Sequence, residues 1–172
     1  MKPGYNSALK QDVHFQVNSQ QVIYSGNPSA RMADVLREDL QQTGTKISCG
    51  VGRCGACSIL VDGELMNACL LMPCQVEGSI ITTIEGIGSK EAMMDPIQEA
   101  FLTEGGFQCG YCTPGMIVAA KALLDQNSDP SVTDIQEALA GNLCRCTGYA
   151  SIIRAVRKAA EVLNAEAANE KS

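Results

Sequence analysis

The stretch Cys49-Gly-Val-Gly-Arg-Cys-Gly-Ala-Cys57 places three cysteines in a loop that also contains three glycines and an arginine. A fourth cysteine, Cys69, follows after eleven residues. Glycine has no Cβ, so this loop can adopt positive φ values and bring its N–H groups close to a bound group. N–H groups aimed at sulfur stabilise an anionic metal–thiolate cluster, and Arg53 adds a positive charge beside it. The stretch therefore predicts one cluster, with these ligands: Cys49, Cys54, Cys57 and Cys69.

The spacing of this first set identifies the kind of cluster. C-x4-C-x2-C with a later fourth cysteine is the pattern of plant-type ferredoxins, whose four thiolates bind [2Fe–2S]. A zinc site is the alternative. Zinc knuckles usually pair two short C-x2-C units, whereas this set contains one. The glycine loop and the spacing together favour iron–sulfur.

A second group of four cysteines precedes two expected helices. Cys109-Gly-Tyr-Cys112 is followed by Thr113-Pro114 and an apolar helical pattern, and Cys144-Arg-Cys146 is followed by Thr147 and another such pattern. Threonine is a common N-cap, and proline suits the first helical position. Each pair is thus expected at a helix N-terminus, where free N–H groups favour an anion. These observations predict a second cluster, with zinc again as the less favoured alternative; its ligands are Cys109, Cys112, Cys144 and Cys146.

The ninth cysteine makes the total odd, which argues against a framework of disulfides. The N-terminal residues lack the apolar segment of a secretory signal. We therefore expect a cytoplasmic chain whose thiols stay reduced and available for metal. The ninth cysteine, Cys74, ends the apolar run Leu70-Leu-Met-Pro-Cys74 and is expected to be a small buried side chain. A reactive thiol or a substitute ligand is the alternative.

The composition excludes two classes of partner. The 172 residues carry a formal net charge of −6 and show no basic stripe, so no nucleic-acid partner is expected. No apolar run is long enough to cross a membrane. The single histidine, His14, alternates with Val13 and Phe15 in a strand pattern, which predicts a solvent-facing position.

Hydrophobic periodicity predicts an α+β fold with two domains. Residues 11–87 are expected to form a β-grasp-like, ferredoxin-type domain; its strands lie near 13–17, 21–24, 58–61, 65–66 and 80–84, with one helix over 30–40 and a hairpin turn at Asp62-Gly63. Residues 88–164 are expected to form a four-helix domain, with helices over 95–103, 116–124, 132–139 and 150–163. Thr133 and Gln136 have the spacing of a capping box for the third helix. Residues 1–10 and 165–172 are expected to be flexible tails.

Three stretches together resemble the small iron–sulfur subunit of the xanthine dehydrogenase family of molybdenum hydroxylases. They are Cys49–Ser58, Gln108–Met116 and Gly141–Tyr149, and the similarity covers about residues 11–163 with the order and spacing of all eight cysteines. The resemblance implies a plant-type ferredoxin-like domain followed by a four-helix [2Fe–2S]-binding domain. It also implies two partners, a molybdopterin-binding large subunit and an FAD-binding medium subunit, in a hetero-oligomer such as a dimer of heterotrimers.

The resemblance further implies an electron path. Gln108 and Cys146 would lie against the pterin, and electrons would pass from the helical-domain cluster to the ferredoxin-like cluster and on to FAD. The chain itself shows no dinucleotide-binding motif, no P-loop and no acid–base constellation, so no catalytic residue is predicted on it. We expect a subunit of a xanthine or other purine dehydrogenase. The alternatives are the same role in an aldehyde, nicotinate, other N-heteroaromatic or carbon monoxide dehydrogenase, or a standalone two-cluster ferredoxin.

Overall fold

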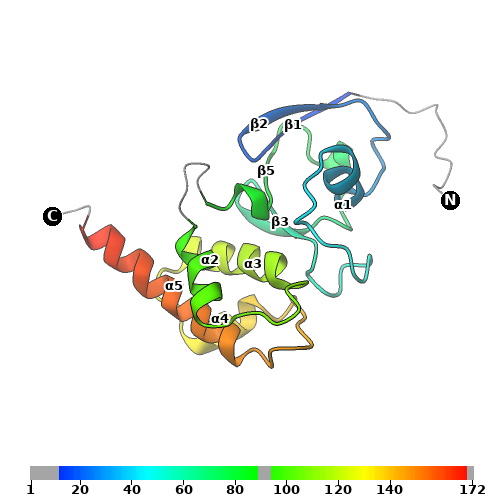
Figure 1. Ribbon diagram of the computed structural model, residues 1–172. Helices are drawn as coiled ribbons and strands as arrows, with labels where there is room; N and C mark the ends of the chain where they lie inside the picture. The colour runs from blue at the N-terminus through cyan, green and yellow to red at the C-terminus, as the bar shows by residue number, and fades with distance from the viewer. Residues whose placement is uncertain (1–11, 89–93, 170–172) are drawn as a thin grey trace.

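A mixed five-stranded sheet forms the first part of the molecule. The computed structural model describes residues 12–88 and 94–169 (Figure 1). The strands are β1 Val13–Val17, β2 Gln20–Tyr24, β3 Ser58–Val61, β4 Glu64–Asn67 and β5 Ile80–Thr82, in the order β2-β1-β5-β3-β4. Only the β1–β5 pair is parallel; the other neighbouring strands are antiparallel. The last strand in sequence therefore lies in the middle of the sheet.

Both hairpins turn through residues with left-handed backbone. In the first, Asn18 and Ser19 have φ values of 48° and 68°, and in the second, Asp62 and Gly63 have φ values of 52° and 87°. Two consecutive positive φ values match the twist of antiparallel strands, which is why Asp-Gly is such a strong turn signal. The predicted hairpin at Asp62-Gly63 is confirmed.

The face of the sheet formed by alternate β1 residues packs on a short helix. Val13, Phe15 and Val17 are buried, whereas His14 between them is exposed, as its alternation predicted. The buried side chains share a core with helix α1, Met32–Asp34, and the π-helical turn η1, Val35–Asp39. The helix predicted over 30–40 therefore exists, but it begins two residues later and widens into a π-turn.

Four further helices lie within the described residues and gather away from α1 and the first hairpin (Figure 1). They are α2 Pro96–Thr103, α3 Thr113–Gln126, α4 Val132–Ala138 and α5 Ala150–Asn169. Their shared core includes Leu60 of β3, because all four residues of that strand are buried. The sheet is thus covered by η1 on one side and by α3 on the other. The predicted α+β fold is confirmed.

Several predicted helix ends are wrong, because capping depends on contacts that periodicity does not report. Helix α3 starts at Thr113, so Cys112 and not Thr113 occupies the N-cap. Helix α4 is capped by Ser131 with Asp134, and not by the pair Thr133 and Gln136. Helix α5 continues to Asn169, so residues 165–169 belong to it and not to a tail.

Other predicted features fall partly beyond the description. The tails 1–10 and 170–172 lie outside the described residues, and the predicted domain boundary at 87/88 adjoins the undescribed residues 89–93. The described residues also contain two short 3-10 turns, η2 Pro73–Gln75 and η3 Ile84–Gly86. Because η3 begins at Ile84, strand β5 is shorter than the predicted 80–84.

Candidate metal centres

The loop between η1 and β3 surrounds its cysteine thiols with N–H donors. The N–H of Gly52 donates to Cys69 Sγ at 3.2 Å, and the N–H of Arg53 donates to Cys49 Sγ at 3.2 Å. Gly52 has a φ of 72°, and a Cβ there would lie 2.3 Å from Cδ1 of Leu70. A side chain at this position would therefore be strained and would displace Leu70. The predicted role of the glycine-rich loop, to aim N–H groups at sulfur, agrees with this geometry.

The four thiols of the first set lie together in two environments. Hydrogen bonds from the N–H groups of Val51 and Arg53 lower the pKa of the Cys49 thiol to about 6, and contact with Cys54 adds to the effect. Burial raises the pKa of Cys57 to about 12, and the neighbouring Cys69 thiol acts in the same direction. Two thiols are thus half-exposed and two are buried, with Cys57 close to Cys54 as well as Cys69.

The second set of thiols also forms two contacting pairs. Cys146 Sγ lies 3.8 Å from Cys109 Sγ, and both residues are exposed. Burial raises the pKa of Cys112 to about 12, and its contact with the Cys144 thiol contributes. The fold therefore brings together thiols that lie more than thirty residues apart in the sequence, as the prediction of a second cluster required.

A threonine supplies hydrogen bonds to the second set. Thr147 donates its hydroxyl to Cys144 Sγ at 3.1 Å and its N–H to the same sulfur at 3.5 Å. Burial alone would raise the pKa of Cys144, but these bonds outweigh it and leave the pKa lowered. Thr147 was predicted to be the N-cap of helix α5. This prediction is wrong, because α5 begins only at Ala150. The N-terminus of α3 does follow Cys112 directly, but Thr113 Oγ1 is buried and has no hydrogen-bond partner among the described residues.

The thiols of each set contact one another in pairs, an arrangement that fits a two-iron cluster. Among residues 12–88 and 94–169, no three His, Cys, Asp or Glu side chains form a group that could hold one metal ion. Each set instead provides two contacting thiol pairs with N–H or O–H donors directed at sulfur. In a [2Fe–2S] cluster bound by four cysteines, each iron takes two thiolates, and such donors stabilise the charge of the cluster. The residues present fit this group at both sites.

The two candidate sites meet at one seam. The N–H of Leu143 donates to the carbonyl of Cys54 at 2.9 Å, and the Tyr111 hydroxyl donates to the carbonyl of Ile47 at 2.6 Å. The Asn142 amide, which is 3% exposed, donates across the same seam. Asn142 lies within the motif Gly141–Tyr149, but no role for it was predicted from the sequence. The available signal was a polar residue two positions before the ligand Cys144.

The predicted pterin-facing residues lie at the surface of the second site. Gln108, Cys109, Arg145 and Cys146 are all exposed. The structure therefore brings Gln108 into the same exposed region as Cys146, because Cys109 and Cys146 are in contact. These side chains are available to a partner.

The prediction for Cys74 is wrong, because its side chain is exposed. The apolar run suggested burial, but the turn η2 holds this residue at the surface, with its N–H bonded to the carbonyl of Pro28 at 3.1 Å. None of the nine cysteines, all of which lie within the described residues, forms a disulfide.

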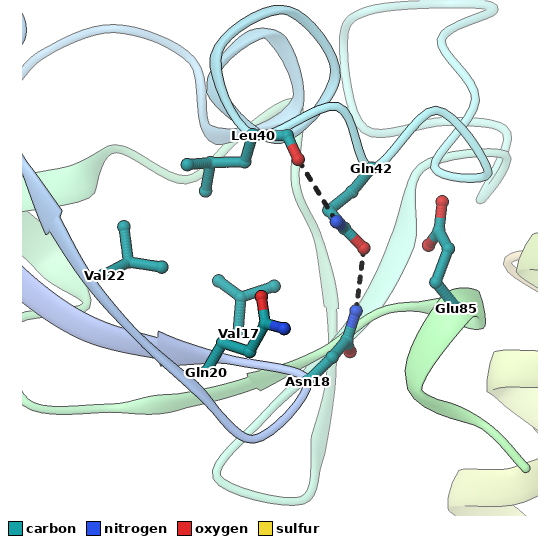
Figure 2. A pocket seen from close by; sticks show the side chains of 7 residues that line it. All are labelled: Val17, Asn18, Gln20, Val22, Leu40, Gln42 and Glu85. Atoms are coloured by element: carbon teal, nitrogen blue, oxygen red, sulfur yellow. Dashed lines mark hydrogen bonds between the residues drawn. The ribbon is translucent and has the colours of Figure 1, made fainter. Parts of the chain in front are cut away.

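A hollow of about 250 Å³ lies between the first hairpin and the end of η1 (Figure 2). Two of its polar residues are hydrogen-bonded to each other: Asn18 Nδ2 donates to Gln42 Oε1 at 2.8 Å and also to Thr83 Oγ1, while Gln42 Nε2 donates to the carbonyl of Leu40. None of the lining residues is a candidate ligand. The Asn18 bonds to Gln42 and Thr83 attach the β1–β2 turn to the neighbouring segments. No helix in the described part of the chain is long and apolar enough to cross a membrane.

Comparison with known proteins agrees with two iron–sulfur sites. A family model for a 2Fe-2S iron-sulfur cluster binding domain matches residues 15–79, and one for a [2Fe-2S] binding domain matches residues 83–157. A Bacillus subtilis protein named as a probable xanthine dehydrogenase subunit is 54% identical over 155 residues, which span 90% of this chain and 88% of that protein. A nicotinate dehydrogenase subunit of Pseudomonas putida is 45% identical over 153 residues, spanning 89% of this chain and 97% of that protein.

Solved structures share the fold. The aldehyde oxidoreductase from Desulfovibrio gigas superposes with a TM-score of 0.86 and 43% identity over 91% of this chain, but this match spans only 17% of that longer chain. Quinoline 2-oxidoreductase from Pseudomonas putida 86 matches with a TM-score of 0.85 and 39% identity, over 90% of this chain and 96% of the matched one. The chain therefore has two [2Fe–2S]-binding domains, of a type found both as separate chains and within longer ones.

Proposed function

Because this chain belongs to the family of small [2Fe–2S] subunits of molybdenum hydroxylases, we propose that it carries electrons from a molybdopterin centre on a large partner subunit to FAD on a medium one. The observation that carries this role is the contact between the two thiol sites at one seam, which joins them into a single route. The expected setting is a cytoplasmic hetero-oligomer, for which a dimer of heterotrimers is one arrangement.

The ligand assignment is part of the proposal. Within residues 11–87 the ligands would be Cys49, Cys54, Cys57 and Cys69, and within residues 88–164 they would be Cys109, Cys112, Cys144 and Cys146. When bound, each [2Fe–2S] cluster supplies a site that accepts and releases one electron at a time. The chain's own residues hold and surround that site: N–H groups of Gly52 and Arg53 and the hydroxyl of Thr147 would stabilise the negative charge on sulfur.

The surface of each site supports a direction of flow. Beside the exposed Cys109 and Cys146, the side chains of Gln108 and Arg145 can hydrogen-bond a polar cofactor, which suits the entry side. The loop 49–57 contains three glycines and exposes only the side chains of Val51 and Arg53, which suits an exit to a second partner. Electrons would thus enter through the helical domain and leave through the ferredoxin-like domain.

The substrate that we propose is a purine such as xanthine or hypoxanthine. The support is the 54% identity with a protein named as a probable xanthine dehydrogenase subunit. A nicotinate dehydrogenase is the second candidate, because a subunit of that name is 45% identical and matches over 97% of its length. Substrate contacts would lie on the molybdenum subunit, so the whole complex must be assayed.

Purification of the tagged chain from its own cells tests both levels of the proposal. Two larger chains carrying molybdopterin and FAD are expected to accompany it, and xanthine should bleach the iron–sulfur absorbance faster than nicotinate or an aldehyde. Faster bleaching by nicotinate would replace the purine assignment with the second candidate. Isolation of the chain with both clusters but no larger partner would support a standalone ferredoxin instead.

Substitution of Gln108 by alanine tests the direction of flow. In the assembled complex, Gln108→Ala is expected to slow reduction of the clusters by substrate about tenfold, the equivalent of one lost hydrogen bond. Reduction from the flavin side should stay nearly unchanged. Stopped-flow absorbance measures both rates. Gln126→Ala is the matched control, because that exposed glutamine lies at the far end of α3. Slower flavin-side reduction with normal substrate-side reduction would contradict the proposed order.

A further inference from the structure

A backbone hydrogen bond links a candidate ligand of the first cluster to the residue before a candidate ligand of the second. Leu143 immediately precedes Cys144, a ligand of the second site, and its N–H donates to the carbonyl of Cys54, a ligand of the first, at 2.9 Å. A route from Cys54 Sγ to Cys144 Sγ therefore runs through the covalent bonds of Cys54, Leu143 and Cys144 and crosses this one hydrogen bond. The separation of the clusters depends on how firmly residues 142–144 are held.

The side chain of Asn142 holds this segment from one side. Its Nδ2 donates to Gly55 O at 3.1 Å, to Ser58 Oγ at 3.2 Å and to Gly115 O at 3.0 Å. Gly55 is next to Cys54, and Gly115 lies in the first turn of α3, which follows Cys112. One buried amide thus binds backbone that adjoins ligands of both clusters. A buried amide with every proton satisfied gives a rigid junction.

The hydroxyl of Tyr149 holds the same segment from the other side. Tyr149 Oη accepts the N–H of Cys144 at 2.8 Å and donates to the carbonyl of Asn142 at 3.0 Å. The N–H of Asn142 donates to Leu139 O at 2.9 Å, so all three N–H groups of residues 142–144 are bonded. Tyr149 itself has a φ of 66°, which is unusual for a residue with a side chain. Such a conformation persists where surrounding contacts over-determine it.

We propose that Asn142 and Tyr149 are positioning residues that fix the separation of the two clusters by holding residues 142–144 against Cys54. The inference rests on the proposed electron-transfer role of the chain. One electron leaves the donor cluster, which is oxidised, and reaches the acceptor cluster, which is reduced; no bond is made or broken and no proton is transferred. Because electron tunnelling decays steeply with distance, a rigid junction keeps this step fast.

The test measures the coupling between clusters rather than activity. The full chain carrying both clusters is reduced completely with dithionite, and the magnetic splitting between the two EPR signals reports their separation, since dipolar coupling falls with the cube of distance. Iron content and the two midpoint potentials are recorded on the same samples. The variants are Asn142→Ala and Tyr149→Phe. The matched controls are Asn164→Ala and Tyr24→Phe; the first of these also removes a hydrogen bond from a side-chain amide to a backbone carbonyl.

Asn142→Ala and Tyr149→Phe are expected to retain iron while their splitting weakens or broadens, more strongly in Asn142→Ala, and both controls should match the unaltered protein. Splitting at the unaltered value in either variant, with iron retained, overturns the proposal. If Asn142→Ala fails to hold both clusters, Tyr149→Phe decides alone, because it removes one oxygen and keeps the ring. Dithionite reduces the clusters without any substrate, so a wrong assignment of the hydroxylase would leave this result unaffected.

Discussion

Replacement of Cys69 by alanine is expected to abolish the EPR signal of the N-terminal cluster and to leave the second, distinct signal in place. Cys69 is 5% exposed, accepts the N–H of Gly52 at 3.2 Å and contacts Cys57, so no other described thiol lies where it could substitute without rearrangement. Loss of one thiolate leaves one iron with an incomplete ligand set. Iron and sulfide analysis should then show about half of the content of the unaltered protein, because one of two clusters is lost.

Cys74→Ala is the matched control for this prediction. It removes a thiol only five residues away, but that thiol is exposed and makes no contact with the other cysteines that the structure records. Iron, sulfide and both EPR signals should be retained. Loss of iron from Cys74→Ala together with a silent Cys69→Ala would reverse the ligand assignment.

Gly115→Ala is expected to destabilise the protein by about 2 kcal/mol, although alanine is the better helix former. A Cβ on Gly115 would lie 2.3 Å from the carbonyl oxygen of Gly55 and 3.4 Å from Cα of Ala56. These are backbone atoms of the first thiol loop, so they cannot move aside as a flexible side chain would. The start of α3 must separate from the loop 49–57, which also strains the hydrogen bonds of Asn142.

Thermal unfolding of the loaded chain measures this effect, and a decrease in the midpoint of about 5 °C is expected. Gly141→Ala is the matched control. Apart from Gly141 and its two chain neighbours, no described atom lies within 4 Å of a Cβ built there, and the φ of Gly141 is outside the left-handed region. The stability of the protein should therefore change by no more than about 0.5 kcal/mol. If the thermal unfolding midpoint of Gly115→Ala equals or exceeds that of the unaltered protein, the prediction is contradicted. The start of α3 and the loop 49–57 would then not be tightly packed against each other.

Prediction from sequence succeeded where neighbouring residues decide the outcome. The hairpin at Asp62-Gly63 follows from two residues that tolerate positive φ, and the alternation around His14 follows from the two-residue period of a strand. The helix ends were less predictable. The N-cap of α3 is Cys112 where Thr113 was predicted, and the N-cap of α4 is Ser131 where Thr133 was predicted. Several nearby residues can cap a helix, and the packing of the helix determines which of them does so.

The local sequence pattern also failed to predict whether individual side chains are buried or exposed. Cys74 ends an apolar run, yet the η2 turn and its bond to Pro28 keep the thiol exposed. Helix α5 extends five residues past the predicted tail boundary, since alanine and glutamate support a helix even where no buried face continues.

The sequence by itself determined the two sets of four cysteines, the glycine-rich loop of the first set and the order of a sheet followed by helices. These features depend on ligand spacing and on short-range hydrophobic periodicity, both of which can be recognised from residues close together in the sequence. Only the tertiary structure decided that the two thiol sites meet. The bonds that join them, from Asn142 to Gly55 and from Tyr111 to Ile47, connect residues 87 and 64 positions apart. Such contacts form only when α3 packs against β3, and no local pattern encodes that docking.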